Sequence, residues 1–177
     1  FNRAGRLYTL VYDKVISREI DPIEKKPLFH FLPGSSAYSI ATVGCNLRCS
    51  FCQNWQISQW PKEHLPKSVQ SAGGREAAEA VCPQIETVEQ AMLGEPVTPQ
   101  QIVDVAVATG SKSIAYTYTE PTVFYELTYD TAVLARKQGL KNIFVTNGFT
   151  GKEALRELAT VLDAANVDLK AFDDRFY

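Results

Sequence analysis

Residues 113–146, SIAYTYTEPTVFYELTYDTAVLARKQGLKNIFVT, predict one complete strand–helix–strand unit. We expect strands at Ser113–Thr119 and Lys141–Thr146, with a helix at Thr122–Gln138 between them. The helix has basic residues in its last turn and is followed by Gly139, and both features are typical of a helix end. The second strand is apolar almost throughout, as expected of a parallel strand that is buried on both faces. This stretch therefore predicts parallel strands joined by helices.

The same alternation continues on both sides of this unit. Upstream, Ser39–Val43 is a β-branched strand candidate, and Thr98-Pro99 begins a helix with Thr98 as its N-cap. Downstream, Thr150-Gly151-Lys152-Glu153 has the form of a capping box, and the helix that it begins includes Leu162. Asn166–Phe172 is the expected fourth strand.

Strand–loop–helix repeats of this kind build α/β folds with a parallel sheet and helices outside it. Several of the strands carry polar residues near their carboxyl ends, where a parallel barrel or sheet builds its site. We expect a partial parallel (β/α) barrel, truncated after about four β/α units. The competing interpretation is a doubly wound open sheet, because the chain ends before the strand order can be inferred.

The first residues fall outside the repeat. Residues 1–38 are expected to form an N-terminal extension that covers a sheet edge or a barrel end. Within it, Leu7–Tyr12 and Val15–Ile20 are short β-like runs that predict a hairpin. The core domain then occupies residues 39–177. We expect it to be incomplete at its C-terminus and the chain to be a piece of a longer protein, because Tyr177 follows directly on a strand-like run.

Residues 59–97 interrupt the core and are too many for an ordinary loop. Gly73-Gly74 and Pro83 break the pattern, whereas Arg75–Ala80 and Ile85–Met92 look helical. We expect a mostly helical surface insertion or lid.

The composition excludes several classes of protein. Of the 177 residues, 45% are hydrophobic and 21% are charged, which suits a folded core rather than a disordered chain. Eighteen Lys and Arg against twenty Asp and Glu leave a net charge of −2, so no basic excess attracts nucleic acid or an anionic membrane. The longest uncharged run, between His30 and Arg48, contains Ser, Gly and Pro and cannot span a membrane. The N-terminus lacks the apolar stretch of a signal peptide, and we expect a cytoplasmic protein.

The strongest chemical signal is the run Cys45-Asn46-Leu47-Arg48-Cys49-Ser50-Phe51-Cys52, with the spacing C-x3-C-x2-C. Three thiolates on one short loop suit a soft metal centre, and a chain without a secretion signal favours reduced thiols over disulfides. A structural zinc site usually needs four ligands, and Cys82, His30 and His64 lack zinc-like spacing to this run. A [4Fe–4S] cluster held by three cysteines instead leaves one iron open to a substrate or cofactor.

The cysteine run resembles the signature of the radical S-adenosylmethionine (SAM) superfamily, which has an aromatic residue just before the last cysteine. More narrowly, the chain resembles the AmmeMemoRadiSam radical SAM family, whose members are often described as pyruvate formate-lyase-activating-enzyme-like. The resemblance extends from about Leu28 to Tyr177, outside the insertion. Four runs carry it: Cys45–Trp55, Tyr116–Thr122, Val145–Gly148 and Asn166–Phe172.

This resemblance implies an oxidoreductase with a [4Fe–4S] cluster and SAM as cofactors. The reduced cluster cleaves SAM to methionine and a 5′-deoxyadenosyl radical, which abstracts hydrogen from the substrate. It implies that Cys45, Cys49 and Cys52 ligate three irons and that SAM chelates the fourth. The expected partners are an electron donor such as flavodoxin or ferredoxin and a protein or peptide substrate. The alternative is an iron–sulfur or zinc-binding module that never cleaves SAM.

Two polar residues at strand ends are candidate SAM contacts. Glu120 follows the second strand, and a carboxylate there can accept hydrogen bonds from a bound ammonium group. Activating enzymes contact the methionine amino group with a Gly-Gly-Glu-Pro run, and here Tyr118-Thr119 replaces the two glycines. The alternative for Glu120 is a helix N-terminal charge favoured by the dipole. Asn147 is either a SAM contact or one half of a plain Asn-Gly turn.

Three further residues complete the predicted cofactor contacts. Asp168 and Lys170 are two apart on the expected fourth strand, so both should point to one face, toward the barrel interior. A charged pair on a buried strand must be paired or face a site, and a structural ion pair is the alternative. The resemblance implies that Lys170 meets the SAM carboxylate and that Asp168 orients the site. It also implies that Phe51 lies against the adenine.

Overall fold

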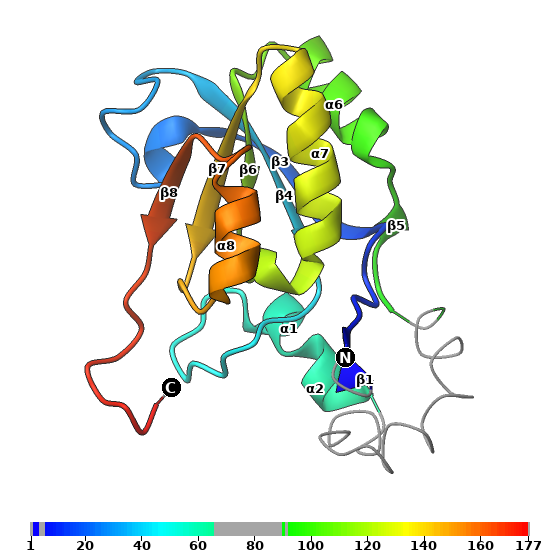
Figure 1. Cartoon of the computed structure of the whole chain (residues 1–177), viewed down its shortest axis with the longest axis vertical. Coiled ribbons are helices and arrows are strands. Elements are labelled where there is room, and N and C mark those ends of the chain that lie inside the picture. Colours follow the sequence, from blue (N-terminus) through cyan, green and yellow to red (C-terminus); the bar gives the residue numbers. More distant parts are fainter. Residues whose placement is uncertain (1, 4–5, 66–89, 91, 177) are drawn as a thin grey trace.

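The computed structural model describes residues 2–3, 6–65, 90 and 92–176, and its centre is a mixed sheet with the strand order β5-β3-β4-β6-β7-β8 (Figure 1). A separate two-stranded ribbon pairs β1 with β2. The strands are β1 (Asn2–Arg3), β2 (Arg6–Leu7), β3 (Lys14–Pro22), β4 (Ser36–Thr42), β5 (Glu95–Pro96), β6 (Ser113–Tyr116), β7 (Lys141–Thr146) and β8 (Ala164–Val167).

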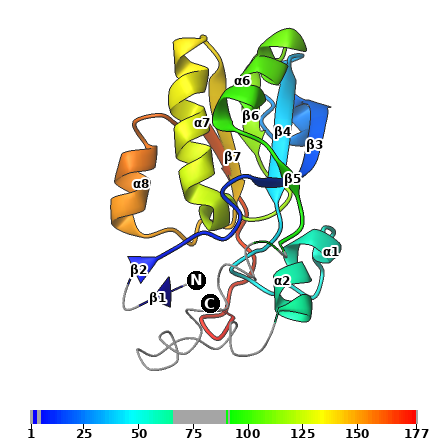
Figure 2. The ribbon, with the colours of Figure 1, turned by 90° about the vertical axis from the view of Figure 1, so that its right-hand side faces the viewer.

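Strands β4, β6, β7 and β8 are parallel and lie in the sheet in the order of the chain. The helices that connect them all cover the same face (Figures 1 and 2). They are α6 (Pro99–Ala108), α7 (Tyr125–Lys137) and α8 (Lys152–Leu158). A doubly wound sheet reverses its strand order and carries helices on both faces. The described strands show neither feature. The fold is therefore the predicted α/β class, with parallel strands in chain order and helices on one face, as in a partial (β/α) barrel.

Local signals explain where the described helices begin and end. Thr98 caps α6 in a capping box with Gln101, and Gly110 takes a φ of +69° just after the helix. The helix predicted at Thr122–Gln138 begins instead with a short 3₁₀ turn, η3 (Pro121–Phe124), before α7. None of the helices in the described part of the chain combines the length and the apolar character of a membrane span.

The last helix and strand differ from the prediction. The capping box at Thr150 is wrong: Gly151 is the N-cap of α8, no side chain caps the helix, and α8 ends at Leu158 before reaching Leu162. Strand β8 ends at Val167 rather than Phe172 because β7, its partner, ends at the matching residue Thr146. A strand persists only while a neighbour accepts its hydrogen bonds. The last such bond runs from the Asp168 N–H to the Thr146 carbonyl, at 2.8 Å.

The predicted hairpin in the extension is also wrong. Strand β3 pairs antiparallel with β4, from Val15 opposite Thr42 to Pro22 opposite Ser36, and its other edge pairs with β5. Of the predicted partner run, Leu7–Tyr12, only Leu7 belongs to a strand, and that strand is β2 of the two-stranded ribbon. A long pairing with the buried strand β4 stabilises β3 more than a short isolated hairpin would.

Several predictions fall on residues that the structure does not describe. The helix predicted at 75–80 and Cys82 lie outside the described residues, as does the helix predicted at 85–92 except for residues 90 and 92. Next to this segment, the chain forms two short helices, α1 (Trp55–Ser58) and α2 (Trp60–His64).

The sheet separates two apolar layers. Side chains such as Ile40, Ile114 and Phe144 pack between the sheet and the helices. A smaller cluster on the opposite face contains Ala115 and Ile143 of the sheet together with Ile23 of the extension. Leu28 and Phe31, also of the extension, pack against it. The N-terminal extension therefore forms part of the wall that faces the barrel interior.

Candidate functional site

A cavity of about 620 Å³ lies at the carboxyl ends of the parallel strands. This is where parallel α/β folds build their sites, and the volume suits a small-molecule ligand. All eight residues predicted from the sequence as metal ligands or cofactor contacts line it: Cys45, Cys49, Phe51, Cys52, Glu120, Asn147, Asp168 and Lys170.

The three cysteines lie on the loop that follows β4. Gly44 opens this loop with a φ of +107°, and a Cβ at this position would crowd Val123 at 3.3 Å. The Gly44 N–H donates to the Ile57 carbonyl at 3.0 Å, which ties the start of the loop to α1. Cys45, Cys49 and Cys52 are free and half-buried.

Helices α1 and α2 hold the middle of the cysteine loop. The Leu47 carbonyl accepts hydrogen bonds from Gln59 Nε2 at 3.2 Å and from Lys62 Nζ at 2.8 Å. The hydroxyl of Ser58, which is buried, lies 3.3 Å from Cys52 Sγ. These contacts join residues up to fifteen positions apart and fix the loop against the short helices.

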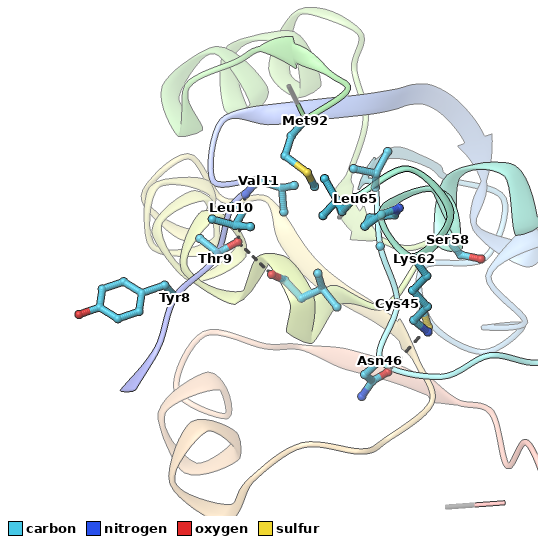
Figure 3. Close-up of a pocket in the computed structure, with 14 residues that line it drawn as sticks. Tyr8, Thr9, Leu10, Val11, Cys45, Asn46, Ser58, Lys62, Leu65 and Met92 are labelled. Carbon is cyan, nitrogen blue, oxygen red and sulfur yellow. Dashed lines mark hydrogen bonds between the residues drawn. The ribbon is translucent and has the colours of Figure 1, made fainter. Parts of the chain in front are cut away.

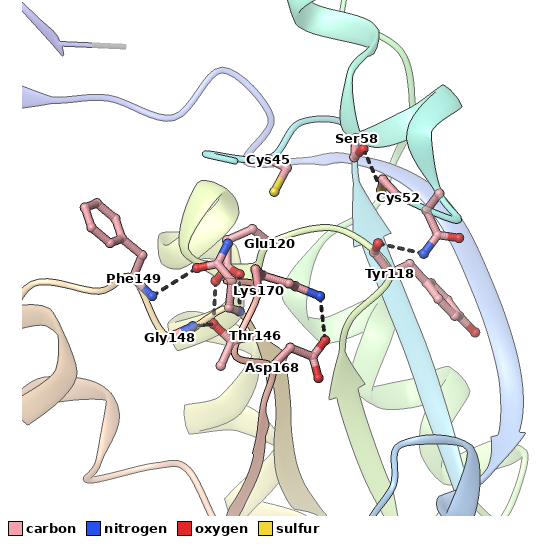
Figure 4. Close-up of polar contacts among 12 residues, drawn as sticks. Cys45, Cys52, Ser58, Tyr118, Glu120, Thr146, Gly148, Phe149, Asp168 and Lys170 are labelled. Carbon is pink, nitrogen blue, oxygen red and sulfur yellow. Dashed lines mark hydrogen bonds and ion pairs between the residues drawn. The ribbon is translucent and has the colours of Figure 1, made fainter. Parts of the chain in front are cut away.

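Glu120 is buried and makes four hydrogen bonds as an acceptor. Its Oε1 accepts from the Thr122 N–H and hydroxyl and from the Thr146 hydroxyl, and its Oε2 accepts from the Asn147 N–H at 2.8 Å. Glu120 is the N-cap of η3, so it does lie at a helix N-terminus, which is the alternative interpretation of this residue. Its bonds to Thr146 and Asn147 also connect the segment after β6 to the end of β7. Figure 4 shows it below Cys45.

Asn147 directly follows β7, at the start of a loop. Its side-chain amide donates to Asn46 Oδ1 at 2.7 Å and its Oδ1 accepts from the Phe149 N–H at 2.9 Å, so it joins β7 to the cysteine loop. Gly148 has a φ of +75°, and a Cβ there would come within 2.9 Å of Val167. Asn147 therefore connects the end of β7 to the cysteine loop through its side chain, and Gly148 supplies the left-handed backbone conformation that follows it.

The sequence predicts Asp168 and Lys170 on the fourth strand, where residues two apart point to one face. Both instead lie after the end of β8, so strand geometry does not explain their common direction. They still form an ion pair, with Lys170 Nζ 2.8 Å from Asp168 Oδ2, and both line the cavity. Lys170 is half-buried rather than buried, with 27% of its side chain exposed. Burial lowers the pKa of Lys170, but the hydrogen bond that Lys170 donates to Asp168 and the negative charge of Asp168, with smaller contributions from Cys49 and Cys52, raise it more. Lys170 therefore lines the cavity as a cation, and Figure 4 shows its contact with Asp168.

Comparison with known proteins identifies the family. Residues 39–177 match the sequence profile of the Radical SAM superfamily. The chain belongs to this superfamily. It is also similar to "Uncharacterized protein MJ0808" of Methanocaldococcus jannaschii, with 45% identity over 176 residues. The match covers 99% of this chain and 44% of that protein, so the chain spans less than half the length of this relative.

Radical SAM proteins use a [4Fe–4S] cluster, and the donor set on the cysteine loop fits one. Three free thiols from one loop line one cavity, as a three-cysteine cluster requires. Among the described residues, no three Cys, His, Asp or Glu side chains yet converge closely enough to hold a metal ion. Cys45 Sγ instead accepts from the Leu47 N–H at 3.4 Å, and Cys52 Sγ contacts Ser58. Cluster binding therefore requires the sulfurs to turn toward one another.

The histidines considered as further ligands are placed elsewhere. His64 stacks on Trp60, with ring centroids 4.8 Å apart, and contacts the Trp60 carbonyl. His30 is exposed on the extension. Neither lines the radical SAM cavity, and no group of zinc ligands is present within the described ranges.

Sequence reasoning missed the wall of the cavity that the extension supplies. Asp21 and Lys26 are almost fully buried and form an ion pair at 2.6 Å, and Lys25 pairs with the same carboxylate at 2.7 Å. The Tyr118 hydroxyl donates to Asp21 as well, and Lys26 Nζ lies 4.5 Å from the centre of the Tyr118 ring. Burial raises the pKa of Asp21, but the bonds from Lys25, Lys26 and Tyr118 together lower it well below its usual range.

Tyr118, which precedes Thr119 and Glu120, has an unusual backbone conformation. Its backbone takes a φ of +62°, which glycine adopts freely and tyrosine rarely does. The Tyr118 carbonyl accepts from Asn54 Nδ2 at 2.9 Å, and its hydroxyl is held by Asp21. Bonds at both ends of the residue therefore stabilise a strained turn beside the cysteine loop. No local signal could have shown this, because Asp21 and Tyr118 are 97 residues apart.

A second, smaller cavity of about 260 Å³ lies on the other side of Cys45 (Figure 3). Apolar side chains such as Val11, Leu65 and Met92 line most of it, and Lys62 is its charged residue. Cys45 and Ser58 line both cavities, so the cysteine loop separates them.

Proposed function

We propose that this chain is the core of a radical SAM enzyme of the AmmeMemoRadiSam, activating-enzyme-like type, acting on a protein or peptide substrate. The observation that supports the radical SAM chemistry is that the three free cysteines and the five predicted cofactor contacts line one cavity. The type and the substrate are proposed from the resemblance of the sequence runs described above. When bound and reduced, the [4Fe–4S] cluster supplies the electron that cleaves SAM and so generates a hydrogen-abstracting radical.

The cysteine loop would hold the cluster through Cys45, Cys49 and Cys52. Three protein ligands leave one iron open, which is the position that an amino-acid ligand such as the methionine part of SAM can chelate. Lys170 presents its ammonium group to the same cavity with Asp168 beside it. This pair would bind and orient the SAM carboxylate through a charge-assisted hydrogen bond.

Glu120 has a more specific role in this proposal. A carboxylate has about four acceptor positions, and three of the four bonds that Glu120 accepts fall on Oε1. The oxygen with remaining capacity is Oε2, which accepts from the Asn147 N–H. We therefore assign Oε2 to the SAM amino group, while Oε1 holds the ends of β6 and β7 in place.

The surface around the cysteine loop supports an external electron donor such as flavodoxin or ferredoxin. Phe51 is 62% exposed and Trp55 is 51% exposed, so apolar surface surrounds the cluster loop where a partner could dock. Phe51 lies at the rim of the cavity, where it would cover the adenine of SAM. Three free thiols also suit a reducing compartment, and the cytoplasm is the proposed location.

Anaerobic reconstitution of the full-length protein with iron and sulfide tests this function. After reduction with dithionite in the presence of SAM, we expect iron and acid-labile sulfide in the protein and 5′-deoxyadenosine among the products. A cluster that is reduced but releases no 5′-deoxyadenosine would favour an iron–sulfur module without SAM cleavage. Zinc without sulfide would favour a structural metal site.

A further inference from the structure

Lys62 is a cation held against the cysteine loop that the proposed function leaves without a role. It is half-buried on α2, and its ammonium group donates to the Leu47 carbonyl at 2.8 Å. Leu47 lies between Cys45 and Cys49, so this bond is made at the centre of the cluster-binding run. Figure 3 shows the Lys62 side chain reaching toward Cys45.

The charge of Lys62 is coupled to the cysteines. The pKa of Lys62 is lowered overall, chiefly by burial and also by the charge of Arg48, while Cys45 and Cys49 act in the opposite direction and raise it. The adjacent cavity is mostly apolar and Lys62 is half-buried, so solvent screens its charge less than that of a fully exposed side chain. Arg48 carries the same charge as Lys62 and lies within the cysteine loop, but its side chain is exposed to solvent.

We propose that Lys62 positions the iron–sulfur cluster loop and raises the reduction potential of the bound cluster. Its hydrogen bond holds the Leu47 carbonyl, and with it the spacing of Cys45 and Cys49. Its positive charge offsets the negative charge of the three thiolates and of the electron that the cluster gains. Hydrogen bonds, nearby charge and solvent exposure are the known means by which a protein sets such potentials. This inference rests on the proposed function, because it requires the cluster.

The redox step that Lys62 affects is a single-electron reduction. The electron comes from the added reductant, dithionite, and the cluster is the group that is reduced. No bond of Lys62 forms or breaks and no proton is transferred. Lys62 acts only by stabilising the reduced form more than the oxidised form, because the reduced form carries one more negative charge.

Three substitutions at Lys62 separate charge from hydrogen bonding. Lys62→Gln removes the charge and keeps an N–H donor, Lys62→Met removes both, and Lys62→Arg keeps both. Arg48→Gln is the matched control, because it removes one positive charge from the exposed side of the same loop. The measurements are iron and sulfide content and an EPR-monitored dithionite titration of the reconstituted full-length protein, without SAM turnover.

We expect Lys62→Gln to retain its cluster but to show about a tenfold lower ratio of reduced to oxidised cluster at a fixed potential, which corresponds to about 59 mV for one electron. Lys62→Met should also bind less iron, because the Leu47 carbonyl loses a donor. Lys62→Arg and Arg48→Gln should stay within roughly twofold of the wild type, since the charge is kept in one and screened by solvent in the other.

Two results would overturn the inference and leave the proposed function intact. One is an unchanged midpoint potential in Lys62→Gln that holds its full iron. The other is an equal shift in Arg48→Gln, which would show that any charge on the loop acts alike. A wild-type protein that takes up no cluster would instead overturn the proposed function, and this inference with it.

Discussion

At the scale of single residues, the ion pair of Lys170 and Asp168 is the most direct test of the cofactor site. Lys170→Ala removes a charge-assisted bond to an anion, worth about 1.5–3 kcal/mol, so SAM affinity should fall roughly tenfold or more. The cluster should remain, because Lys170 is not a ligand. Equilibrium binding of SAM under anaerobic conditions measures the effect. An unchanged affinity would reduce the pair to a structural salt bridge.

Cys49 tests the ligand assignment in the same way. Cys49→Ala leaves two thiols on the loop, too few to hold a cube with one open iron, and should remove the iron–sulfur absorbance of reconstituted protein. Cys82→Ala is the matched control and should keep the cluster. A full cluster in Cys49→Ala would show that Cys49 is not a ligand. Iron loss from Cys82→Ala would show that Cys82 is one.

At the scale of secondary-structure elements, a buried ion pair joins β3 to the start of the following segment and to the end of β6. Lys26→Met removes one of the partners of the buried Asp21 and leaves Lys25 and Tyr118 bonded to it. Removing one partner of a buried pair is strongly destabilising, and we expect a loss of about 3 kcal/mol in the free energy of unfolding. Urea denaturation measures it. The exposed Lys141, paired with Asp163 at the surface, supplies the control: Lys141→Met should change stability by less than about 1 kcal/mol.

The same network predicts a pH dependence. The pKa of Asp21 is lowered in the folded state, so its stabilising contribution is complete above its ordinary pKa of 3.8 and is lost as the pH falls toward the folded value. The difference in unfolding free energy between the wild type and Asp21→Asn should therefore shrink on acidification below about pH 4. Denaturation curves over this range provide the measurement. A difference that stays constant with pH would mean that Asp21 is protonated throughout or contributes nothing as an anion.

At the scale of the whole molecule, the site lies at an open end of the sheet with the cysteine loop at the surface. Half-buried thiols and an exposed Phe51 leave a bound cluster accessible to oxidants. Air should therefore bleach the cluster, and SAM should slow the loss by covering the open iron. Absorbance followed after exposure to air, with and without SAM, gives the two rates. An air-stable cluster without SAM would contradict an open iron.

Features that depend on neighbouring residues could be predicted before the fold was known. The cysteine spacing lies within eight positions, the N-cap Thr98 and the helix-starting Pro99 are adjacent, and the apolar run of β7 lies within six positions. The order of strands and helices followed from these local patterns, and so did the placing of polar residues at strand ends. The roles of Glu120, Asn147 and Phe51 toward SAM remain predictions.

Only the tertiary structure decided the features that depend on a distant partner. Strand β8 ends where β7 ends, and β3 pairs with β4 instead of its sequence neighbour, because a strand is defined by the hydrogen bonds of another strand. The bond from Tyr118 to Asp21 spans 97 residues, and the bond from Asn147 to Asn46 spans 101. Burial then gives these contacts their strength, since a charge such as that of Lys26 acts strongly only once water is excluded. Neither the pairing with a distant residue nor the exclusion of water can be predicted from the spacing of residues along the chain.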